Sequence, residues 1–412
     1  MKAEIITIGD ELLIGQTIDT NSAWMGEELS KLGFDIFRKT SIHDNRTDIL
    51  ETLKEATGRS DVVLITGGLG PTIDDITKET ICEFFNSRLV INEEVLGMIE
   101  EMIRRRGTTM NENNRKQAMV PDLCRVLYNK MGTAPGLWFE KEKTIFVFMP
   151  GVPYEMKYIM SEHLLPELKK QYRTRVIIHR NIMTYGAPEA RLAELLSEFE
   201  AALPADIKLA YLPSFGIIKL RLTGSGSDRN VVDNMIGEQA DRLYSIIPEY
   251  IYAEDEKPFE MVIGNFLKER KQTICAAESC TGGNISRMIT SIPGSSAYFK
   301  GSVIAYDNSV KSDLLGVPRE LFDKFGAVSE EVVKAMANGV RNILGTHYSV
   351  ATSGIAGPDG GTESRPVGTV WIAVASVKDT VAEKHVFGND RNFNITRFSN
   401  AALNLVLKQI TG

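Results

Sequence analysis

Short apolar runs alternate with longer amphipathic stretches along the first 172 residues. The runs EIITIG, FDIFRKTSI and DVVLITGG are typical of strands, whereas TNSAWMGEELSKLG and RTDILETLKEATGR place apolar residues at helical spacing. Strands that alternate with helices predict a parallel sheet covered on both faces. In such sheets the ligand crevice lies beyond the carboxyl ends of the strands. We therefore predict an α/β domain over residues 1–172, with its site at that edge.

The pattern changes after residue 172. The next segment carries strands around RVIIHRNIMTYG, IKLAYLPS and GIIKLRLTG and two helical stretches, which predicts a small α+β module with antiparallel strands. The charged run AEDEKPFE predicts a linker, because few core contacts can cross such a segment. Alternating helices and strands then return up to the C-terminus. The sequence therefore predicts an α/β chain of three domains, over residues 1–172, 173–254 and 255–412.

Composition supports a folded chain and excludes several functional classes. The 412 residues are 43% hydrophobic and 25% charged, as in ordinary globular proteins. The formal charge of -7 gives no broad basic field for nucleic acid or a membrane surface, so neither is expected as a partner. No apolar stretch reaches the roughly 18 residues of a membrane span, and the N-terminus is typical of a strand, not of a signal peptide. The four cysteines form neither a disulfide framework nor a zinc motif, so we expect a reducing, cytoplasmic location.

A serine, a tyrosine and a lysine follow one another in GSSAYFKGSVIAYDNSVK, residues 294–311. A serine hydroxyl is a good nucleophile only when a neighbouring group accepts its proton. The two histidines of the third domain lie at or near expected strands, so Lys311 is the candidate base for Ser296. Tyr306 is placed to relay a proton or to orient the lysine. The spacing by itself is more typical of surface or packing residues.

Two glycine-rich segments of the third domain add to this pattern. Residues 277–283, AESCTGG, follow a strand and open a helix, where backbone N–H groups and the helix dipole can hold a phosphate or carboxylate. Residues 353–361, SGIAGPDGG, form a turn after another strand, which suits an oxyanion hole or a ligand lid. The alternative for the second segment is a tight turn that needs only positive φ.

AESCTGG, PGSSAYFKGSVIAYDNSVK, SGIAGPDGGTESRPVGTVWIAVA and GNDR together resemble the CinA C-terminal domain family, the nicotinamide mononucleotide (NMN) deamidases. The resemblance implies hydrolysis of the NMN carboxamide to nicotinate mononucleotide and ammonia, without a metal or other cofactor. It implies Ser296 as the nucleophile, Lys311 as its base and Tyr306 as the third member. It further implies a set of substrate-binding residues: Glu278, Ser279, Thr281, Gly283, Ser353, Gly354 and Arg391.

Two glycine-rich turns and four carboxylates are expected to meet at one edge of the first sheet. GDE, residues 9–11, ends the first strand, and TGGLGPTIDD, residues 66–75, ends the third and enters a helix. Carboxylates beside a phosphate-binding loop suit a divalent metal ion that bridges to a pyrophosphate. The predicted metal ligands are Asp10, Glu11, Asp74 and Asp75, and the predicted loop contacts are Gly68, Gly70 and Thr72. The alternative for Asp74 and Asp75 is helix capping.

The stretches GDELLIGQTIDTNSAWM, TGGLGPTIDDITKE, NNRKQAMVP, NKMGTAPG and MPGVPYEM resemble the CinA N-terminal domain, which is related to molybdopterin-binding proteins of the MoaB/MogA type. The resemblance implies two competing activities: molybdopterin binding, and metal-dependent hydrolysis of ADP-ribose to AMP and ribose 5-phosphate. Leu69, Ile73 and Asp74 stand where molybdopterin-handling relatives carry threonine and arginine. A lost positive charge and a gained negative charge should weaken binding of that ligand's phosphate, so we favour ADP-ribose hydrolysis.

The middle module resembles the KH-like domain of full-length CinA proteins. Nucleic-acid-binding KH domains use a G-x-x-G loop, whereas this segment offers GSGS, residues 224–227, in slightly acidic surroundings, so no nucleic acid is expected. The resemblance also implies a homodimer. The prediction is thus a bifunctional enzyme of pyridine nucleotide salvage that acts on NMN and ADP-ribose. The alternative is a non-catalytic nucleotide- or molybdopterin-binding protein associated with competence.

Overall fold

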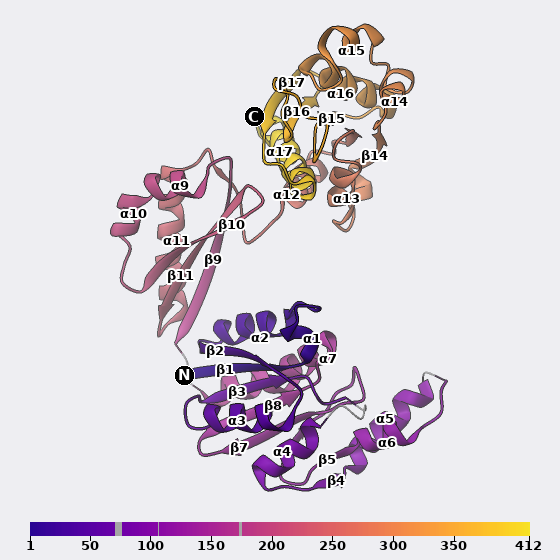
Figure 1. Ribbon diagram of the computed structural model, residues 1–412. Coiled ribbons are helices and arrows are strands. Elements are labelled where there is room, and N and C mark those ends of the chain that lie inside the picture. Colours follow the sequence, from indigo (N-terminus) through magenta and orange to yellow (C-terminus); the bar gives the residue numbers. More distant parts are fainter. Residues whose placement is uncertain (71–75, 106, 173–174) are drawn as a thin grey trace. The chain divides into compact units, whose positions relative to one another are not determined.

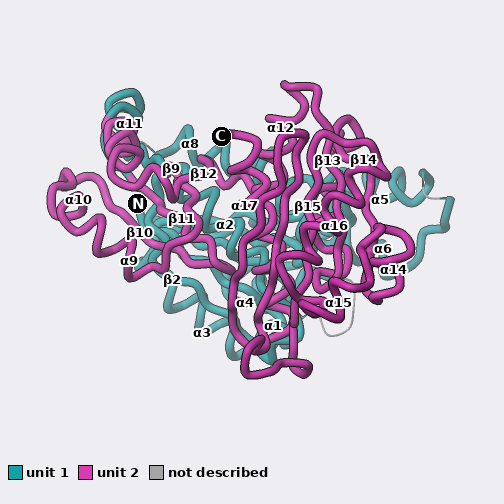
Figure 2. The backbone as a smooth tube through the Cα atoms, turned by 90° about the horizontal axis from the view of Figure 1, so that it is seen from above, with its two compact units in different colours: residues 1–178, 224–234 teal, residues 179–223, 235–412 magenta. Residues whose placement is uncertain are grey.

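The structure is a computed structural model that describes residues 1–70, 76–105, 107–172 and 175–412. The fold class is the predicted one, a three-domain α/β chain with mixed sheets and helices (Figure 1). By its internal contacts the chain divides into two compact units, residues 1–178 with 224–234 and residues 179–223 with 235–412 (Figure 2). No helix in the described residues is long and apolar enough to cross a membrane.

A six-stranded sheet forms the centre of the N-terminal domain, in the order β2-β1-β3-β8-β7-β6. Its four strands β2, β1, β3 and β8 are parallel, as predicted, whereas β7 and β6 are antiparallel. The difference arises because Glu142 and Lys143, both at positive φ, join β7 to β8, and so tight a turn connects only antiparallel strands. The strands are β1 Lys2–Ile8, β2 Asp35–Ile42, β3 Val62–Thr66, β6 Arg125–Leu127, β7 Gly136–Lys141 and β8 Thr144–Met149, with a separate pair, β4 Leu89–Ile91 and β5 Met119–Pro121.

Helices cover both faces of this sheet. Successive residues of a strand point to opposite faces, and Ile5 and Ile6 accordingly join two different apolar clusters. One cluster includes α2 and the helices after β8, and the other includes α3 and α4. The helices are α1 Asp10–Leu13, α2 Thr20–Lys31, α3 Arg46–Ala56, α4 Thr77–Phe85, α5 Glu93–Arg105, α6 Glu112–Gln117, α7 Pro153–Ile159 and α8 Leu165–Gln171, with a π-helical turn at Met160–Leu164.

The middle module has the predicted antiparallel component. Its four-stranded sheet has the order β10-β11-β9-β12, and β9 and β12 are antiparallel. Three helices accompany the sheet. The elements are β9 Val176–Tyr185, α9 Glu189–Leu195, α10 Ser197–Ala201, β10 Ile207–Ser214, β11 Ile217–Gly226, α11 Arg229–Ile246 and β12 Ile251–Glu254.

The C-terminal domain contains a five-stranded sheet in the order β14-β13-β15-β16-β17. The strands β14, β13 and β15 are parallel, whereas β16 and β17 are antiparallel to their neighbours. The carboxyl ends of three strands therefore meet at one edge. The strands are β13 Ile274–Glu278, β14 Phe299–Ile304, β15 Tyr348–Gly354, β16 Thr369–Ala375 and β17 Thr380–Val386.

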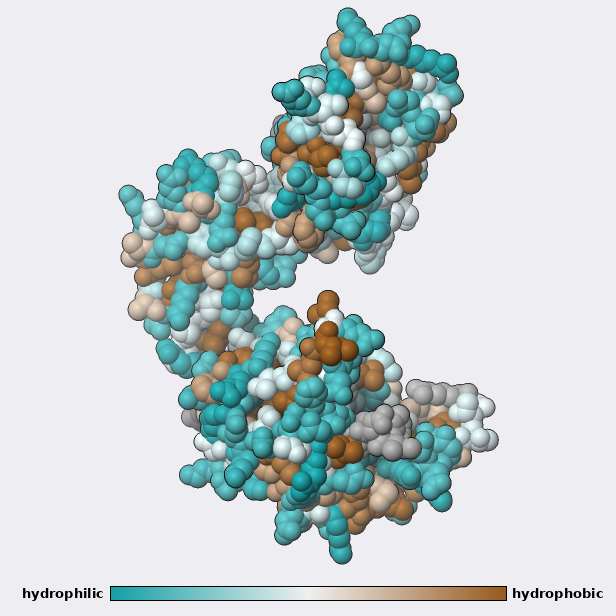
Figure 3. All heavy atoms as spheres, in the orientation of Figure 1, coloured by the Kyte–Doolittle hydropathy of each residue, from teal (hydrophilic) through white to brown (hydrophobic). Residues whose placement is uncertain are grey.

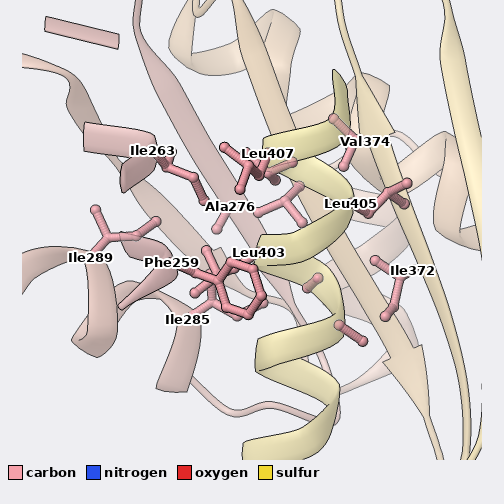
Figure 4. Packing of buried hydrophobic residues seen from close by; sticks show 14 of the residues in the cluster. Phe259, Ile263, Ala276, Ile285, Ile289, Ile372, Val374, Leu403, Leu405 and Leu407 are labelled. Carbon is pink, nitrogen blue, oxygen red and sulfur yellow. The ribbon is translucent and has the colours of Figure 1, made fainter. Parts of the chain in front are cut away.

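Two apolar layers fix this sheet. On one face Ile274 and Ala276 of β13 pack against three helices, α12, α13 and α17 (Figure 4). On the other face Cys275 and Ala277 pack against α16. A strand buried on both faces is held rigidly, so the segments at its carboxyl end have a fixed base. The helices are α12 Phe259–Glu269, α13 Asn284–Thr290, α14 Asn308–Asp313, α15 Arg319–Phe325, α16 Glu330–Leu344 and α17 Arg391–Thr411, with a 3-10 turn at Ser295–Ala297.

Candidate active site

A cavity of about 300 Å³ lies at the carboxyl ends of β13 and β15. Its walls come from the turn after β13, the segment from β14 into α14, the loop after β15 and the first residue of α17. The predicted residues that line it are Ser279, Tyr306, Lys311, Ser353, Gly354 and Arg391. The volume suits part or all of a small ligand, and the position agrees with the crevice expected for such sheets.

Lys311 is the buried basic side chain of this cavity. Its side chain is 2% exposed, and its Nζ donates hydrogen bonds to the carbonyl of Tyr306 and to Oδ1 of Asn308, both at 3.2 Å. No ion pair of Lys311 is found in the part of the chain that the structure describes. Burial lowers the pKa of Lys311 from its ordinary value, and the nearby carboxylate of Asp307 opposes this shift in part. The side chain thus meets a requirement for a general base.

Ser296 lies away from this cavity. The 3-10 turn that contains it precedes β14, and the carbonyl of Tyr298 accepts a hydrogen bond from the N–H of Ile274 at the start of β13. Lys311 follows the other end of β14, so the length of that strand, about 20 Å, separates it from Ser296. The predicted pairing of Ser296 with Lys311 is therefore absent within one chain. Ser296 precedes β14 and Lys311 follows it, and the two ends of a strand lie on opposite sides of the sheet.

Ser279 is the serine that shares the cavity with Lys311. It follows directly on β13 and is 8% exposed, and its backbone N–H donates to the carbonyl of Thr352 at 3.1 Å. That bond fixes the residue at the junction of β13 and β15. Ser353 also lines the cavity, but its hydroxyl donates to the carbonyl of Ala327 at 2.7 Å.

Glu278 binds the turn that follows it. Its carboxylate is fully buried and accepts hydrogen bonds of 2.9–3.0 Å from the N–H groups of Gly283, Ile285 and Ser286. The hydroxyl of Ser286 adds a fourth, at 2.5 Å. The start of α13 was predicted to hold a ligand's phosphate or carboxylate; here it holds the chain's own carboxylate, so the structure contradicts a substrate contact for Glu278 and for the N–H of Gly283.

Thr281 is likewise turned inward. It is 2% exposed, and its hydroxyl pairs with that of Thr352 at 2.8 Å. Like Glu278 and Gly283, which the structure also describes, Thr281 does not line the cavity. These three residues shape the turn that carries Ser279, and the predicted direct contact of Thr281 with a substrate is not formed in this structure.

Arg391 and Tyr306 form one wall of the cavity. The guanidinium donates to the Tyr306 hydroxyl at 3.0 Å and to the carbonyl of Gly357 at 2.8 Å. Both side chains are exposed, so a ligand can reach them. Tyr306 contacts Lys311 through its backbone carbonyl, while its hydroxyl belongs to Arg391.

Two asparagines of the site were not found from the sequence. Asn308 accepts from Lys311, and the three-residue spacing of the two was the available signal, although no helix was predicted there. Asn394 is fully buried in α17 and donates to the carbonyls of Ala356 and Gly388, at 2.9 and 2.7 Å. Its amide thereby ties the cavity loop to the turn before α17, a contact that no local pattern reveals.

A second, smaller cavity of about 120 Å³ lies at the carboxyl ends of β1 and β3 in the N-terminal domain. Glu11, Asp19 and Asn21 line it together with apolar residues that include Leu12 and Ile18. Exposed apolar side chains gather here, with Ile14 73% and Ile18 83% exposed, and Figure 3 shows brown atoms over α1. The cavity therefore combines carboxylates with one apolar wall.

The predicted metal site is only partly described. Thr72, Asp74 and Asp75 lie outside the described residues. Asp10 contacts Nδ1 of His43 at 2.6 Å, and the described residues contain no group of three His, Cys, Asp or Glu side chains that could hold a metal ion. The donors present do not by themselves fit a divalent ion, so the four-carboxylate site stays a prediction.

Gly68 occupies a position that excludes a side chain. Its φ is +66°, and an added Cβ would lie 2.1 Å from Oγ1 of Thr77 and 3.3 Å from a carboxylate oxygen of Asp44. Thr77 in turn donates to Asp44 at 3.1 Å. Gly68 of the predicted phosphate loop thus lies directly against Thr77, the first residue of α4. Gly70, the other predicted glycine of the loop that is described, is half-buried.

Two CinA-like proteins resemble this chain over nearly its whole length. A CinA-like protein of Cytophaga hutchinsonii is 49% identical over 99% of this chain and 98% of its own length. The chain belongs to the CinA family. A second CinA-like protein, of Flavobacterium psychrophilum, is 47% identical and covers the whole of this chain and 99% of its own.

Three family models divide the CinA chain. They are the probable molybdopterin binding domain over residues 4–170, the damage-inducible protein CinA KH domain over 179–253 and the CinA C-terminal domain over 256–410. The crystal structure of the competence/damage inducible protein CihA from Agrobacterium tumefaciens is 32% identical, with a TM-score of 0.37, over 37% of this chain and 94% of that one. The predicted membership of the full-length CinA family is thereby confirmed.

Proposed function

We propose that the C-terminal domain hydrolyses the carboxamide of NMN to nicotinate mononucleotide and ammonia. One observation carries the proposal: a lysine buried at the wall of a cavity, with neutral hydrogen-bond acceptors and a lowered pKa, shares that cavity with a serine. A lysine of this kind can take the proton of a serine hydroxyl at moderate pH. The resemblance to NMN deamidases supplies the substrate.

Ser279 is the nucleophile that this geometry favours. Lys311 takes the hydroxyl proton as the Oγ of Ser279 attacks the carboxamide carbon. Lys311 then gives the proton to the departing nitrogen, and ammonia leaves an ester on Ser279. A water molecule, deprotonated by Lys311, cleaves the ester to release the carboxylate and restore the serine. One water is consumed and no redox step occurs, so the reaction needs no cofactor.

Arg391 is suited to the anionic part of the nucleotide. Its planar guanidinium is held by Tyr306 and Gly357 yet remains exposed at the cavity wall. A guanidinium group can donate two parallel hydrogen bonds to one phosphate. The single buried amine of Lys311 cannot bind a phosphate in this way. The two basic side chains of the cavity thus have separate roles: Lys311 acts at the bond that breaks, and Arg391 binds the phosphate.

The deamidase is tested by ammonia and nicotinate mononucleotide release from NMN, without added metal. Ser279→Ala and Lys311→Ala should each abolish turnover, whereas Ser296→Ala should retain it. No turnover by the parent chain would overturn the proposed activity. Turnover lost in Ser296→Ala and kept in Ser279→Ala would instead assign the nucleophile to Ser296. It would then have to be the partner subunit's Ser296, since within one chain it lies at the opposite edge of the sheet.

We propose that the N-terminal domain hydrolyses ADP-ribose to AMP and ribose 5-phosphate. The cavity at the ends of β1 and β3 supports this, because it sits beside the Gly68 loop and combines carboxylates with an apolar wall. No step through a metal ion is derived, since the described donors alone do not fit one. The alternative is binding without turnover of a nucleotide or of molybdopterin, in line with the family model over residues 4–170.

Of the two alternatives for the N-terminal domain, only ADP-ribose hydrolysis releases a product, AMP. AMP release from ADP-ribose, assayed with each of several divalent metal ions and with none, supports the hydrolase; tight ADP-ribose or molybdopterin binding without AMP supports the binding protein. We also propose a homodimer, for which the molar mass of the full chain in solution is the direct measurement.

A further inference from the structure

The uncharged side-chain amide of Asn308 lies beside the amine of Lys311. Asn308 is the first residue of α14, so it lies one turn before Lys311 on the same face of the helix. Its Oδ1 accepts from Nζ at 3.2 Å, and it lines the same cavity as Ser279. The second acceptor of Nζ, the carbonyl of Tyr306, is also neutral.

The carboxylate next to Asn308 in the sequence, that of Asp307, forms its hydrogen bonds elsewhere. Asp307 caps α14, and its Oδ1 accepts from the N–H and the hydroxyl of Ser309 at 2.8 and 2.6 Å. Asp307 is exposed, so water and salt weaken its field at Lys311. The side chain that accepts a hydrogen bond from Lys311 Nζ is therefore the neutral amide of Asn308, and not the carboxylate of Asp307 one residue earlier.

We propose that Asn308 is a positioning residue that presents Lys311 to the cavity as an uncharged amine with its lone pair free. The inference rests on the proposed amidohydrolase function and names a residue that this function did not include. It assigns Asn308 an effect on the base alone, since Asn308 acts through Lys311 and is given no bond to the substrate.

The count of donors and acceptors supports this assignment. A neutral lysine amine has two N–H groups and one lone pair, whereas an ammonium has three N–H groups. The carbonyl of Tyr306 and Oδ1 of Asn308 satisfy two donors. With both N–H groups held, the lone pair of a neutral amine points away from them and can receive the proton of Ser279. An ammonium would carry a third donor for which the described residues offer no bond.

The other charged and titratable groups around the cavity do not replace Asn308. Cys280, from the turn after β13, stays a neutral thiol, because burial raises its pKa to about 12. Asp359, from the loop after β15, and Arg391, from α17, line the cavity with opposite charges. Glu278 accepts four hydrogen bonds from Gly283 and from the first turn of α13. The neutral acceptor next to Nζ is thus the feature that separates this lysine from one held in an ion pair.

The test compares Asn308→Asp with Asp307→Asn. Asn308→Asp places a carboxylate at Nζ and should move the acid limb of the pH–rate profile for NMN upward by at least one pH unit, which lowers kcat about tenfold for each unit at pH values on that limb. Asp307→Asn changes the charge by the same amount in the opposite sense one residue away and keeps a capping side chain. It should shift the limb slightly downward.

A second readout measures Lys311 without any substrate. Competitive labelling with acetic anhydride across pH, followed by mass spectrometry, gives the pKa of Lys311 itself. The labelling pKa should rise in Asn308→Asp and should not rise in Asn308→Leu, which removes the acceptor without adding charge. If Asn308→Asp does not fold, the Leu variant still decides: a raised labelling pKa there would contradict the assignment.

The two readouts separate the possible failures. A parent chain that does not hydrolyse NMN, but whose Lys311 labelling shifts as expected, refutes the proposed function and leaves the effect of Asn308 on the amine intact. A parent chain that hydrolyses NMN, with labelling and pH–rate profile unmoved in Asn308→Asp, overturns the inference about Asn308.

Discussion

The guanidinium of Arg391 donates a 3.0 Å hydrogen bond to the hydroxyl of Tyr306, and this bond joins the first residue of α17 to the segment after β14. The two residues are 85 positions apart in the sequence. The bond leaves the Tyr306 hydroxyl with Arg391 and the Tyr306 carbonyl with Lys311. Tyr306 thus connects Lys311 to Arg391, although its hydroxyl was predicted to relay a proton or to orient the lysine.

Arg391→Lys should weaken substrate binding more than it slows the chemical step. A lysine retains the charge but cannot donate to Tyr306, to Gly357 and to a phosphate from one planar group. We expect KM for NMN to rise about tenfold, equivalent to about 1.4 kcal/mol, with kcat changed less than threefold. Steady-state kinetics measure this split. Tyr306→Phe is the matched variant, because it removes one acceptor of Arg391 and should raise KM by a smaller factor.

Lys311→Met should stabilise the fold while it abolishes deamidation. The folded state holds the pKa of Lys311 below its ordinary value of 10.5, so between these two values the unfolded chain binds the proton that the folded chain releases. Stability attributable to Lys311 therefore rises with pH in that window and is lowest below it. Replacement by methionine removes this cost. Each kcal/mol gained raises Tm by about 2–4 °C.

The pH dependence of the gain is the diagnostic measurement for Lys311→Met. Thermal unfolding of the parent and the variant should differ most at the lower pH values and converge as the pH approaches 10.5. A difference in Tm that is constant with pH would show that the methionine acts by packing alone.

Glu278→Gln should lower the free energy of unfolding, because the Glu278 carboxylate holds the segment that follows Ser279 by hydrogen bonds. The carboxylate accepts four hydrogen bonds in a fully buried position, and an amide can accept through one oxygen only. Buried donors left without a partner cost about 1–3 kcal/mol each. We expect a loss of about 2–4 kcal/mol in a urea titration. Glu383→Gln, at a half-buried ion pair with His385 on β17, is the control and should lose less.

The sequence was sufficient for many of the strands and helices, because each apolar run and each amphipathic stretch is a local signal. Strands such as β13 and helices such as α17 follow directly from their patterns. The antiparallel strands β7 and β6 were missed, since direction depends on the connection as well as on the strand. The register of the strands and the identity of the edge strands likewise depend on which strands pair, and a single sequence does not show this pairing.

The candidate site was predicted in part for the same reason. Lys311, Ser279 and Arg391 were all named, because each belongs to a distinctive motif. Ser296 was placed beside Lys311 on the assumption that a loop, a strand and a loop return to one crevice, which parallel pairing of β14 with β13 rules out within a chain. Glu278 was expected to face a ligand, but a glycine-rich turn offers its N–H groups equally to a carboxylate on the preceding strand.

Gly68→Ala should abolish ADP-ribose hydrolysis without affecting NMN deamidation. The added Cβ would lie 2.1 Å from Oγ1 of Thr77, and the alanine would have to keep a φ of +66°, so either Gly68 or Thr77 must shift. Gly58→Ala is the matched control, because its φ is +71° and no atom lies within 4 Å of the added Cβ. Both variants bear a left-handed backbone cost of about 1 kcal/mol. Only Gly68→Ala forces a shift at Gly68 or Thr77.

The measurement is AMP release from ADP-ribose and ammonia release from NMN by the same preparations. AMP release should fall at least tenfold in Gly68→Ala and stay within twofold of the parent in Gly58→Ala, while ammonia release stays unchanged in both. Equal loss of AMP release in the two variants would assign the effect to backbone strain in general. Retention of AMP release in Gly68→Ala would contradict the proposed dependence of the N-terminal activity on the backbone at Gly68, where an added Cβ lies 2.1 Å from Thr77 Oγ1.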